Sequence, residues 1–317
     1  MNFNKLKFYF FNRQFRKTKP KNIFLNFNNN KIDKLYNQSF NNKKKLILTT
    51  QVGRGGGKWL VDIINQCKNV RAFGERNRKE ESIFRYNCSH LKKKPSKKLI
   101  KLIKTEALSD WEVKNISYIS SPYFSHGISG LSNYIRPNKI VIIIRDFKGL
   151  FNSLINKGWY SDNYSISNPN NIKNLPKKFI NRPNHFYGRY LNFKELNKKF
   201  ISSNQTTRVA LFMLHTIKKI YQELLMIDKD KLFLFNLKKA DQNYLYCKNF
   251  LKQLDLNLAI NEKKFLSLKK RTSSEIENED IRIDKKDNLE VQKFKFQYEN
   301  YLKKINKLLQ NKKYQKI

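Results

Sequence analysis

A run of three glycines between two cations directly follows a short apolar stretch near the start of the chain. The run reads, in order, Arg54, Gly55, Gly56, Gly57, Lys58 and Trp59. Glycines lack a Cβ, so their backbone N–H groups can turn toward one ligand, and the dipole of a following helix also attracts an anion. A flexible turn, the alternative interpretation, needs neither three glycines nor two flanking cations. The run therefore predicts a phosphate-binding loop.

A second group of phosphate-binding candidates follows a later apolar stretch. Residues 140–144 are followed by Arg145 and Asp146, and Ser153 comes eight residues after Arg145. Asp146 can cap a helix, and the Ser153 hydroxyl can reach the ligand that Arg145 holds. Because ligands bind at the carboxyl ends of strands in open α/β sheets, both groups are expected at one edge, where they indicate a ligand with two phosphates. The alternative for Arg145 is a structural ion pair with Asp146 or another carboxylate.

These residues must be positioned by a sheet, and alternating apolar runs and helical patterns predict one. The expected strands are residues 46–50, 70–73, 116–120, 140–144 and 232–235. The fourth run is continuously β-branched, which is typical of a central strand buried on both faces. Apolar residues at helical spacing predict helices after the first and fourth strands, at about 207–227, at 241–254 and through residues 291–308. The sequence therefore predicts an α/β fold, with a parallel sheet flanked by helices on both faces.

Composition divides the chain into three parts. Residues 1–43 form a basic N-terminal arm, which we expect to be disordered or loosely docked. Residues 44–270 form a single α/β domain, and residues 271–317 form an acidic loop followed by a C-terminal amphipathic helix. Within the domain, residues 158–205 are rich in Asn, Pro and aromatic residues, and we interpret them as an insertion near the substrate face.

The net charge of +41 suggests a polyanionic partner. However, Lys and Asn are frequent along the whole chain, and beyond the first 45 residues the charge is spread rather than concentrated. We therefore expect no specific nucleic acid as partner, although a non-enzymatic nucleic-acid-binding protein remains an alternative function. The basic arm is also suited to peripheral contact with a membrane surface.

The cysteines, Cys67, Cys88 and Cys247, are odd in number and lack metal-type spacing. They predict neither a disulfide framework nor a metal site, and they fit a reducing compartment such as the cytoplasm. No apolar run has the length needed to cross a bilayer.

The two groups of phosphate-binding candidates together resemble the sulfotransferases that use 3′-phosphoadenosine 5′-phosphosulfate. The resemblance covers roughly residues 44–256 and implies a P-loop NTPase-like fold. It implies that the loop 54–59 cradles the 5′ end of this co-substrate, while Arg145 and Ser153 clamp its 3′-phosphate. Residues 70–78, VRAFGERNR, are similar to a strand that ends in Gly-Glu in many members, and residues 231–256 are similar to the family's late strand-loop-helix.

The resemblance implies transfer of a sulfuryl group to an acceptor hydroxyl, with no metal required. Arg54 and Lys58 would be catalytic by stabilising the charge that develops on the 5′-phosphate, and Arg271 would close on the nucleotide from the C-terminal side. Members of the family usually have Ser-Gly-Thr-Thr where this chain has Gly55-Gly56-Gly57-Lys58. Backbone N–H groups and the Lys58 ammonium must therefore replace the lost hydroxyls, or the donor is a different one.

Two residues are candidates for the base that accepts the acceptor's proton. Glu75 follows the second strand, with Arg76 and Arg78 nearby to orient it or the substrate. Its alternative is a surface carboxylate paired with one of those arginines. His126 follows the third strand, in a region where other sulfotransferases place a catalytic histidine, although a lone histidine in a loop is more often structural or exposed to solvent.

The strongest rival enzyme is a nucleoside-triphosphate-dependent kinase or NTPase. Gly53-x-x-x-Gly57-Lys58 approximates a Walker A loop, but it is one residue short, and Trp59 stands where the magnesium-binding Ser or Thr belongs. The acceptor of the sulfuryl group cannot be read from the sequence. Carbohydrate is favoured because the resemblance is closer to the Gly-Glu type of sulfotransferase than to the type that acts on small phenols.

Overall fold

The computed structural model describes residues 23–90, 94–160, 203–240, 243–272 and 285–310 of the 317-residue chain. Its described part contains one sheet of five parallel strands in the order β2-β3-β1-β4-β5. The strands are β1 (Lys45–Gln51), β2 (Val70–Gly74), β3 (Ile116–Ser120), β4 (Lys139–Ile144) and β5 (Leu232–Asn236). All five predicted strands are confirmed, each to within about one residue at either end.

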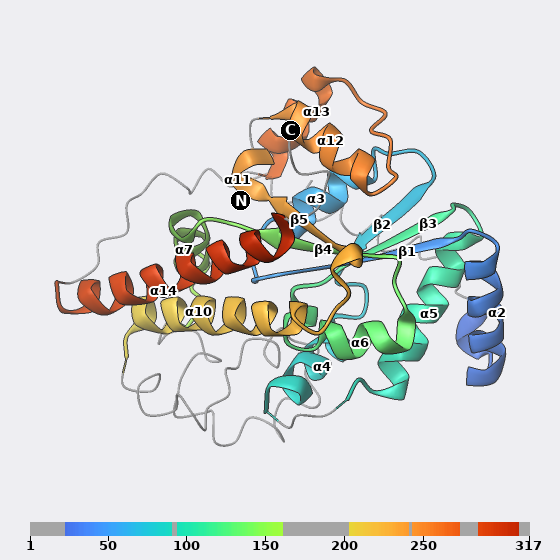
Figure 1. Cartoon of the computed structure of the whole chain (residues 1–317), viewed down its shortest axis with the longest axis horizontal. Coiled ribbons are helices and arrows are strands. Elements are labelled where there is room, and N and C mark those ends of the chain that lie inside the picture. Colours follow the sequence, from blue (N-terminus) through green and yellow to red (C-terminus); the bar gives the residue numbers. More distant parts are fainter. Residues whose placement is uncertain (1–22, 91–93, 161–202, 241–242, 273–284, 311–317) are drawn as a thin grey trace, which may run out of the picture.

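Helices cover both faces of the sheet, which confirms the predicted α/β architecture (Figure 1). One face carries α3 (Gly57–Ile64), α11 (Leu237–Ala240), α12 (Tyr244–Gln253) and α13 (Glu262–Thr272). The other face carries α4 (Arg78–His90), α5 (Lys97–Trp111), α6 (Ile128–Ile135), α7 (Phe147–Ile155), α10 (Gln205–Leu224) and α14 (Lys285–Gln310). Short 3-10 helices are η1 (Ile23–Asn26), η2 (Pro122–His126) and η4 (Lys229–Lys231).

The apolar run of β4 explains why two cores form. Its even-numbered residues, Ile140, Ile142 and Ile144, belong to the core beneath α10 and α14, whereas Val141 and Ile143 belong to the core beneath α3 and α12. Successive side chains of a strand point to opposite faces, so a continuously apolar strand is buried on both sides. The prediction for residues 140–144 is thereby confirmed.

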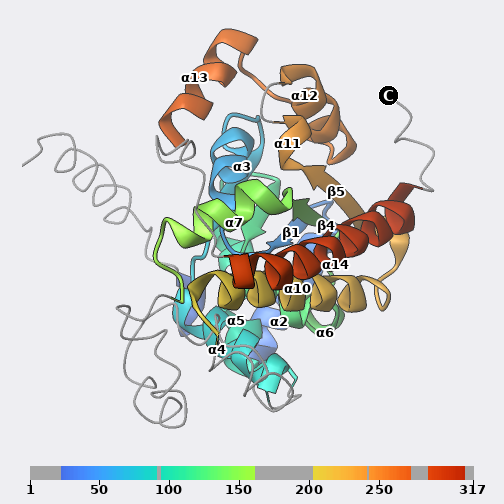
Figure 2. The same cartoon turned by 90° about the vertical axis from the view of Figure 1, so that its left-hand side faces the viewer.

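The predicted late helices are present with shifted ends. The helix expected at 207–227 is α10, and the one expected at 241–254 is α12, which begins at Tyr244. The terminal helix α14 begins at Lys285 and lies along α10 (Figure 2). It therefore takes in part of the loop that the sequence suggested for 271–288, of which residues 273–284 lie outside the described residues.

Part of the N-terminal arm is folded, contrary to the expectation of a disordered or loosely docked segment. Helix α2 (Asn29–Asn41) packs against α5, with Ile32 and Tyr36 buried. The Tyr36 hydroxyl donates a hydrogen bond to the Ile135 carbonyl at 2.6 Å, and its ring lies 5.2 Å from that of Trp111. Apolar residues at i, i+4 and i+8 give this segment one face to bury despite its polar composition. Residues 1–22 lie outside the described part.

The predicted insertion at 158–205 lies mostly outside the described residues, which omit 161–202. Trp159 and Tyr160, at its start, pack against Phe212 of α10. In the part of the chain that the structure describes, no helix has the length and apolar character needed to cross a membrane.

Candidate functional site

The glycine loop connects β1 to α3 at the carboxyl edge of the sheet. Gly56 is the N-cap of α3 and has a φ of 99°, in the left-handed region. A residue with a Cβ would pay about 1–2 kcal/mol for such a backbone, so this position favours glycine. Because the capping residue has no side chain, it leaves the first N–H groups of the helix to another acceptor.

Packing, as well as backbone conformation, excludes side chains from this loop. A Cβ at Gly53 would lie 2.9 Å from the Trp159 ring, and one at Gly55 would lie 2.7 Å from the Val52 carbonyl oxygen. A Cβ at Gly57 would lie only 2.2 Å from Nε2 of Gln51. Each distance is too short for a real contact, so the loop is held by its surroundings. This crowding favours a shaped binding loop over a flexible turn.

The two groups of phosphate-binding candidates meet at this edge, because β1 and β4 are neighbours in the sheet. Arg54 Nε donates a hydrogen bond to Ser153 Oγ at 3.2 Å, and Arg145 Nη1 donates to the Arg54 carbonyl at 3.3 Å. The hydroxyl of Tyr298, from α14, donates to the Arg145 carbonyl at 3.0 Å. The structure thus brings Arg54, Arg145 and Ser153 together beside the loop.

Helix α7 supplies a second helix N-terminus at this edge. The Asp146 carboxylate caps the helix by accepting a hydrogen bond from the Gly149 N–H at 2.8 Å, as its position in the sequence predicted. The Arg145 side chain folds across the same first turn, since a Cβ at Gly149 would lie 3.0 Å from Arg145 Nε. Gly149 therefore gives the guanidinium room to lie against α7, close to Arg54.

Lys58 and Trp59 lie in the first turn of α3, but one side chain is exposed and the other is buried. Lys58 is exposed in the first turn of the helix, beside the glycine loop. The Trp59 ring is buried in the core, with its centroid 6.2 Å from that of Phe235 and 5.9 Å from that of Phe265. Only the backbone of Trp59 can therefore face a ligand, and its side chain offers no oxygen to a magnesium ion.

Glu75 sits in the ion pair that the sequence left open as its alternative. Its carboxylate lies 2.8 Å from Arg78 Nε, whereas Arg76 is held by Asp110 at 2.7 Å and does not orient Glu75. Glu75 follows the edge strand β2, and β3 separates this strand from β1. Neighbouring strands lie about 4.8 Å apart, so β2 is about 10 Å from the strand that carries the glycine loop.

His126 lies at the end of η2, which follows β3, the direct neighbour of β1. It is a buried residue rather than a solvent-facing one, with 3% of its surface exposed. Its Nδ1 is 3.0 Å from the Ser125 hydroxyl, and its ring stacks on that of His215 of α10 at 5.5 Å. In strand order, His126 is therefore closer to the glycine loop than Glu75 is.

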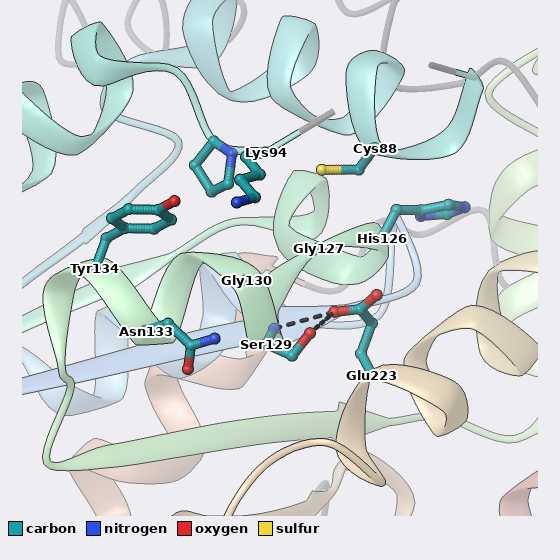
Figure 3. A pocket seen from close by; sticks show the side chains of 10 residues that line it. Cys88, Lys94, His126, Gly127, Ser129, Gly130, Asn133, Tyr134 and Glu223 are labelled. Atoms are coloured by element: carbon teal, nitrogen blue, oxygen red, sulfur yellow. Dashed lines mark hydrogen bonds between the residues drawn. The ribbon is translucent and has the colours of Figure 1, made fainter. Parts of the chain in front are cut away.

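A polar pocket of about 370 Å³ opens where α4, α6 and α10 meet, with His126 in its wall (Figure 3). Glu223 closes one side, where its Oε2 accepts hydrogen bonds from the Ser129 N–H at 3.0 Å and from the Ser129 hydroxyl. Burial, with the Glu223 charge as a second cause, raises the pKa of the Cys88 thiol to about 12. Cys88 therefore stays protonated and is a poor nucleophile.

Glu81 is a buried carboxyl that sequence reasoning missed. Its Oε2 accepts a hydrogen bond from the Ser121 hydroxyl at 2.7 Å, and its Oε1 accepts one from the Asn77 N–H at 3.1 Å. Burial raises its pKa to about 8, from an ordinary 4.5. In the sequence, a glutamate within a polar helix such as α4 looks like a solvent-exposed residue. No sequence pattern therefore indicated that Glu81 is buried.

The remaining predicted site residue, Arg271, falls in the last turn of α13, and its side chain lies outside the described residues. Among the side chains that are described, no group of three or more His, Cys, Asp or Glu residues is placed to hold a metal ion.

Comparison with known proteins adds no assignment to this geometry. No protein-family model matches the chain, and no curated protein matches it either. The residues at the carboxyl ends of β1 and β4 are therefore the basis for a functional proposal.

Proposed function

We propose that this protein is a sulfotransferase that moves a sulfuryl group from 3′-phosphoadenosine 5′-phosphosulfate to an acceptor hydroxyl. The observation that carries the proposal is the contact between the two predicted phosphate-binding groups, in which Arg54 Nε bonds Ser153 Oγ at 3.2 Å and Arg145 bonds the Arg54 carbonyl. If the glycine turn had a structural role only, a second arginine and a hydroxyl would not be expected beside it. The strand order is compatible with the P-loop NTPase-like fold that this function implies.

In this proposal the two groups bind opposite ends of the co-substrate. Arg145 and the Ser153 hydroxyl bind the 3′-phosphate, while Arg54, Lys58 and the N–H groups at the start of α3 bind the 5′-phosphate. The bond between sulfur and the bridging oxygen breaks as the acceptor oxygen bonds to sulfur, and adenosine 3′,5′-bisphosphate leaves. The cations at the loop stabilise the negative charge that develops on the departing phosphate.

The acceptor hydroxyl must lose its proton to a base, for which the proposal offers His126 and Glu75. The strand order favours His126, whereas Glu75 lies at the far edge of the sheet, in an ion pair with Arg78. His126→Gln and Glu75→Gln separate these roles, because only replacement of the base should remove the acidic limb of the pH-rate profile of transfer. A carbohydrate is the proposed acceptor class.

Calorimetric titration tests the co-substrate part of this proposal. The parent protein should bind adenosine 3′,5′-bisphosphate and prefer it to ATP with magnesium. Arg145→Ala and Ser153→Ala should each abolish this binding. The matched controls are Arg136→Ala and Ser267→Ala. Arg136 is an exposed arginine after α6, and the Ser267 hydroxyl donates a hydrogen bond to the Lys264 carbonyl within α13. Preference for ATP would instead support the kinase or NTPase alternative.

The transfer reaction itself is tested with co-substrate carrying labelled sulfur. Glycans, lipids, peptides and phenols are offered as acceptors, and label should appear in one class with the parent protein. Arg145→Ala should reduce transfer in proportion to its loss of binding. If the Arg145 and Ser153 variants bind the bisphosphate as tightly as the parent does, the site assignment is refuted.

A further inference from the structure

Gln51 is the last residue of β1, and its side chain lies directly against the glycine loop. Only 5% of the residue is exposed. A Cβ at Gly57 would lie 2.2 Å from Gln51 Nε2 and 2.6 Å from Gln51 Oε1, and a Cβ at Gly55 would lie 3.3 Å from Gln51 Cβ. The carboxamide therefore occupies the space that a side chain at the first residue of α3 would fill.

The oxygen of this carboxamide has no hydrogen-bond partner among the described residues. Leaving a buried carbonyl oxygen unpaired is costly, so such a group calls for an explanation. Of the two amide atoms, Nε2 lies nearer the position that a Gly57 side chain would occupy, at 2.2 Å against 2.6 Å for Oε1. An anion in the loop would therefore meet the N–H group of the amide rather than its carbonyl.

We propose that Gln51 is a ligand of the 5′-phosphate and donates an amide N–H to it in place of the missing loop hydroxyl. This inference rests on the proposed function. The sulfotransferases that the sequence resembles have a hydroxyl residue where this chain has Gly57. Such a residue and Gln51 exclude one another here, because the added Cβ would come within 2.2 Å of the amide. Glycine at 57 and glutamine at 51 therefore form a matched pair.

The placement of Gln51 also suits a phosphate chemically. Arg54 and Lys58 are exposed cations, whose attraction for an anion is weakened by solvent and salt. Gln51 is buried and neutral, so it supplies a hydrogen bond to the charged ligand without the cost of burying a charge of its own.

The affinities for three nucleotides distinguish a phosphate-binding role of Gln51 from other roles. Calorimetry compares adenosine 3′,5′-bisphosphate, adenosine 5′-monophosphate and adenosine 3′-monophosphate on the parent, Gln51→Ala and Gln51→Met, the last of which keeps the side-chain volume. Both variants should bind the two 5′-phosphorylated ligands about tenfold more weakly, the loss expected for one hydrogen bond to a charged group. Binding of the 3′-monophosphate should not change. Gln66→Ala, a half-buried glutamine beyond the end of α3, is the matched control.

A double variant tests whether Gln51 and Gly57 are a pair. Gly57→Thr alone should lose affinity for adenosine 3′,5′-bisphosphate, and Gln51→Ala combined with Gly57→Thr should regain it, because the hydroxyl then has room. If the parent binds the bisphosphate and both Gln51 variants bind it equally well, this inference is overturned while the proposed function stands. An equal loss for the 3′-monophosphate also overturns it, because the effect is then on the fold. If the parent binds none of the three nucleotides, both proposals fail.

Discussion

Replacing Gly56 by alanine should destabilise the protein by about 2–3 kcal/mol. The φ of 99° at this position places an alanine in the left-handed region, at a cost of about 1–2 kcal/mol. The new Cβ would also lie 2.7 and 2.8 Å from the two Cδ atoms of Leu237. Because Leu237 is only half-buried, its side chain can turn away, which adds about 1 kcal/mol.

Gly130→Ala is the matched control, since it makes the same chemical change with the opposite expected sign. Gly130 lies inside α6, and a Cβ there would meet no heavy atom closer than Pro95 Cδ at 3.8 Å, an ordinary contact. Alanine in a helix interior is better than glycine by about 0.5–1 kcal/mol, so this variant should be slightly more stable than the parent.

Thermal unfolding followed by circular dichroism measures both effects. For a folded unit of this size, 1 kcal/mol shifts the Tm by about 2–4 °C, so Gly56→Ala should lower the Tm by roughly 4–12 °C and Gly130→Ala should raise it by about 1–4 °C. A Tm for Gly56→Ala within about 1 °C of the parent would show that the loop does not need glycine at this position. The argument for a shaped anion loop would then fail.

Three further predictions concern residues that support the site. Tyr298→Phe removes the hydrogen bond to the Arg145 carbonyl and should cost about 0.5–1.5 kcal/mol in urea unfolding. Asp110→Ala removes the buried carboxylate whose two oxygens accept hydrogen bonds from Arg76 Nη2, and should cost about 3–5 kcal/mol, measured in the same way. Because burial raises the pKa of Glu81 to about 8, its carboxyl gains a proton on folding, and its contribution to stability is complete below about pH 4.5 and lost as the pH rises to about 8. Glu81→Gln should remove this part of the pH dependence of the urea midpoint.

The sheet was predictable because its strands are defined by local pattern. The β-branched run at 140–144 is apolar at every position, a pattern that a strand buried on both faces requires, and it is buried as expected. The meeting of Arg54 with Ser153 was predictable for the same reason. Arg54 follows the carboxyl end of β1, and Ser153 lies in α7, the helix that follows the carboxyl end of β4. Parallel strands end at one edge of their sheet.

Partners across the fold were not predictable, because periodicity defines a buried face but not what covers it. Arg76 was expected to orient Glu75 or the substrate, yet it pairs with Asp110, 34 residues away on α5. The buried face of α2 is formed by Ile32 and Tyr36. The residues around them are polar, so the composition of the segment did not indicate a packed helix. Gln51 was not predicted because its side chain meets Gly57 only in the folded chain.

The support of Arg145 by α14 shows how a distant element can control the site. The Tyr298 hydroxyl bonds the Arg145 carbonyl, Arg145 bonds the Arg54 carbonyl, and Arg54 bonds Ser153. These contacts connect the terminal helix with both β1 and α7, so the geometry of the candidate phosphate-binding residues depends on how α14 packs. Tyr298 is fully buried, and burial raises its pKa, so it remains a neutral donor at physiological pH. A loss of nucleotide affinity in Tyr298→Phe that exceeds its loss of stability would show that α14 positions Arg145, whereas unchanged affinity would mean that β4 and α7 position it unaided.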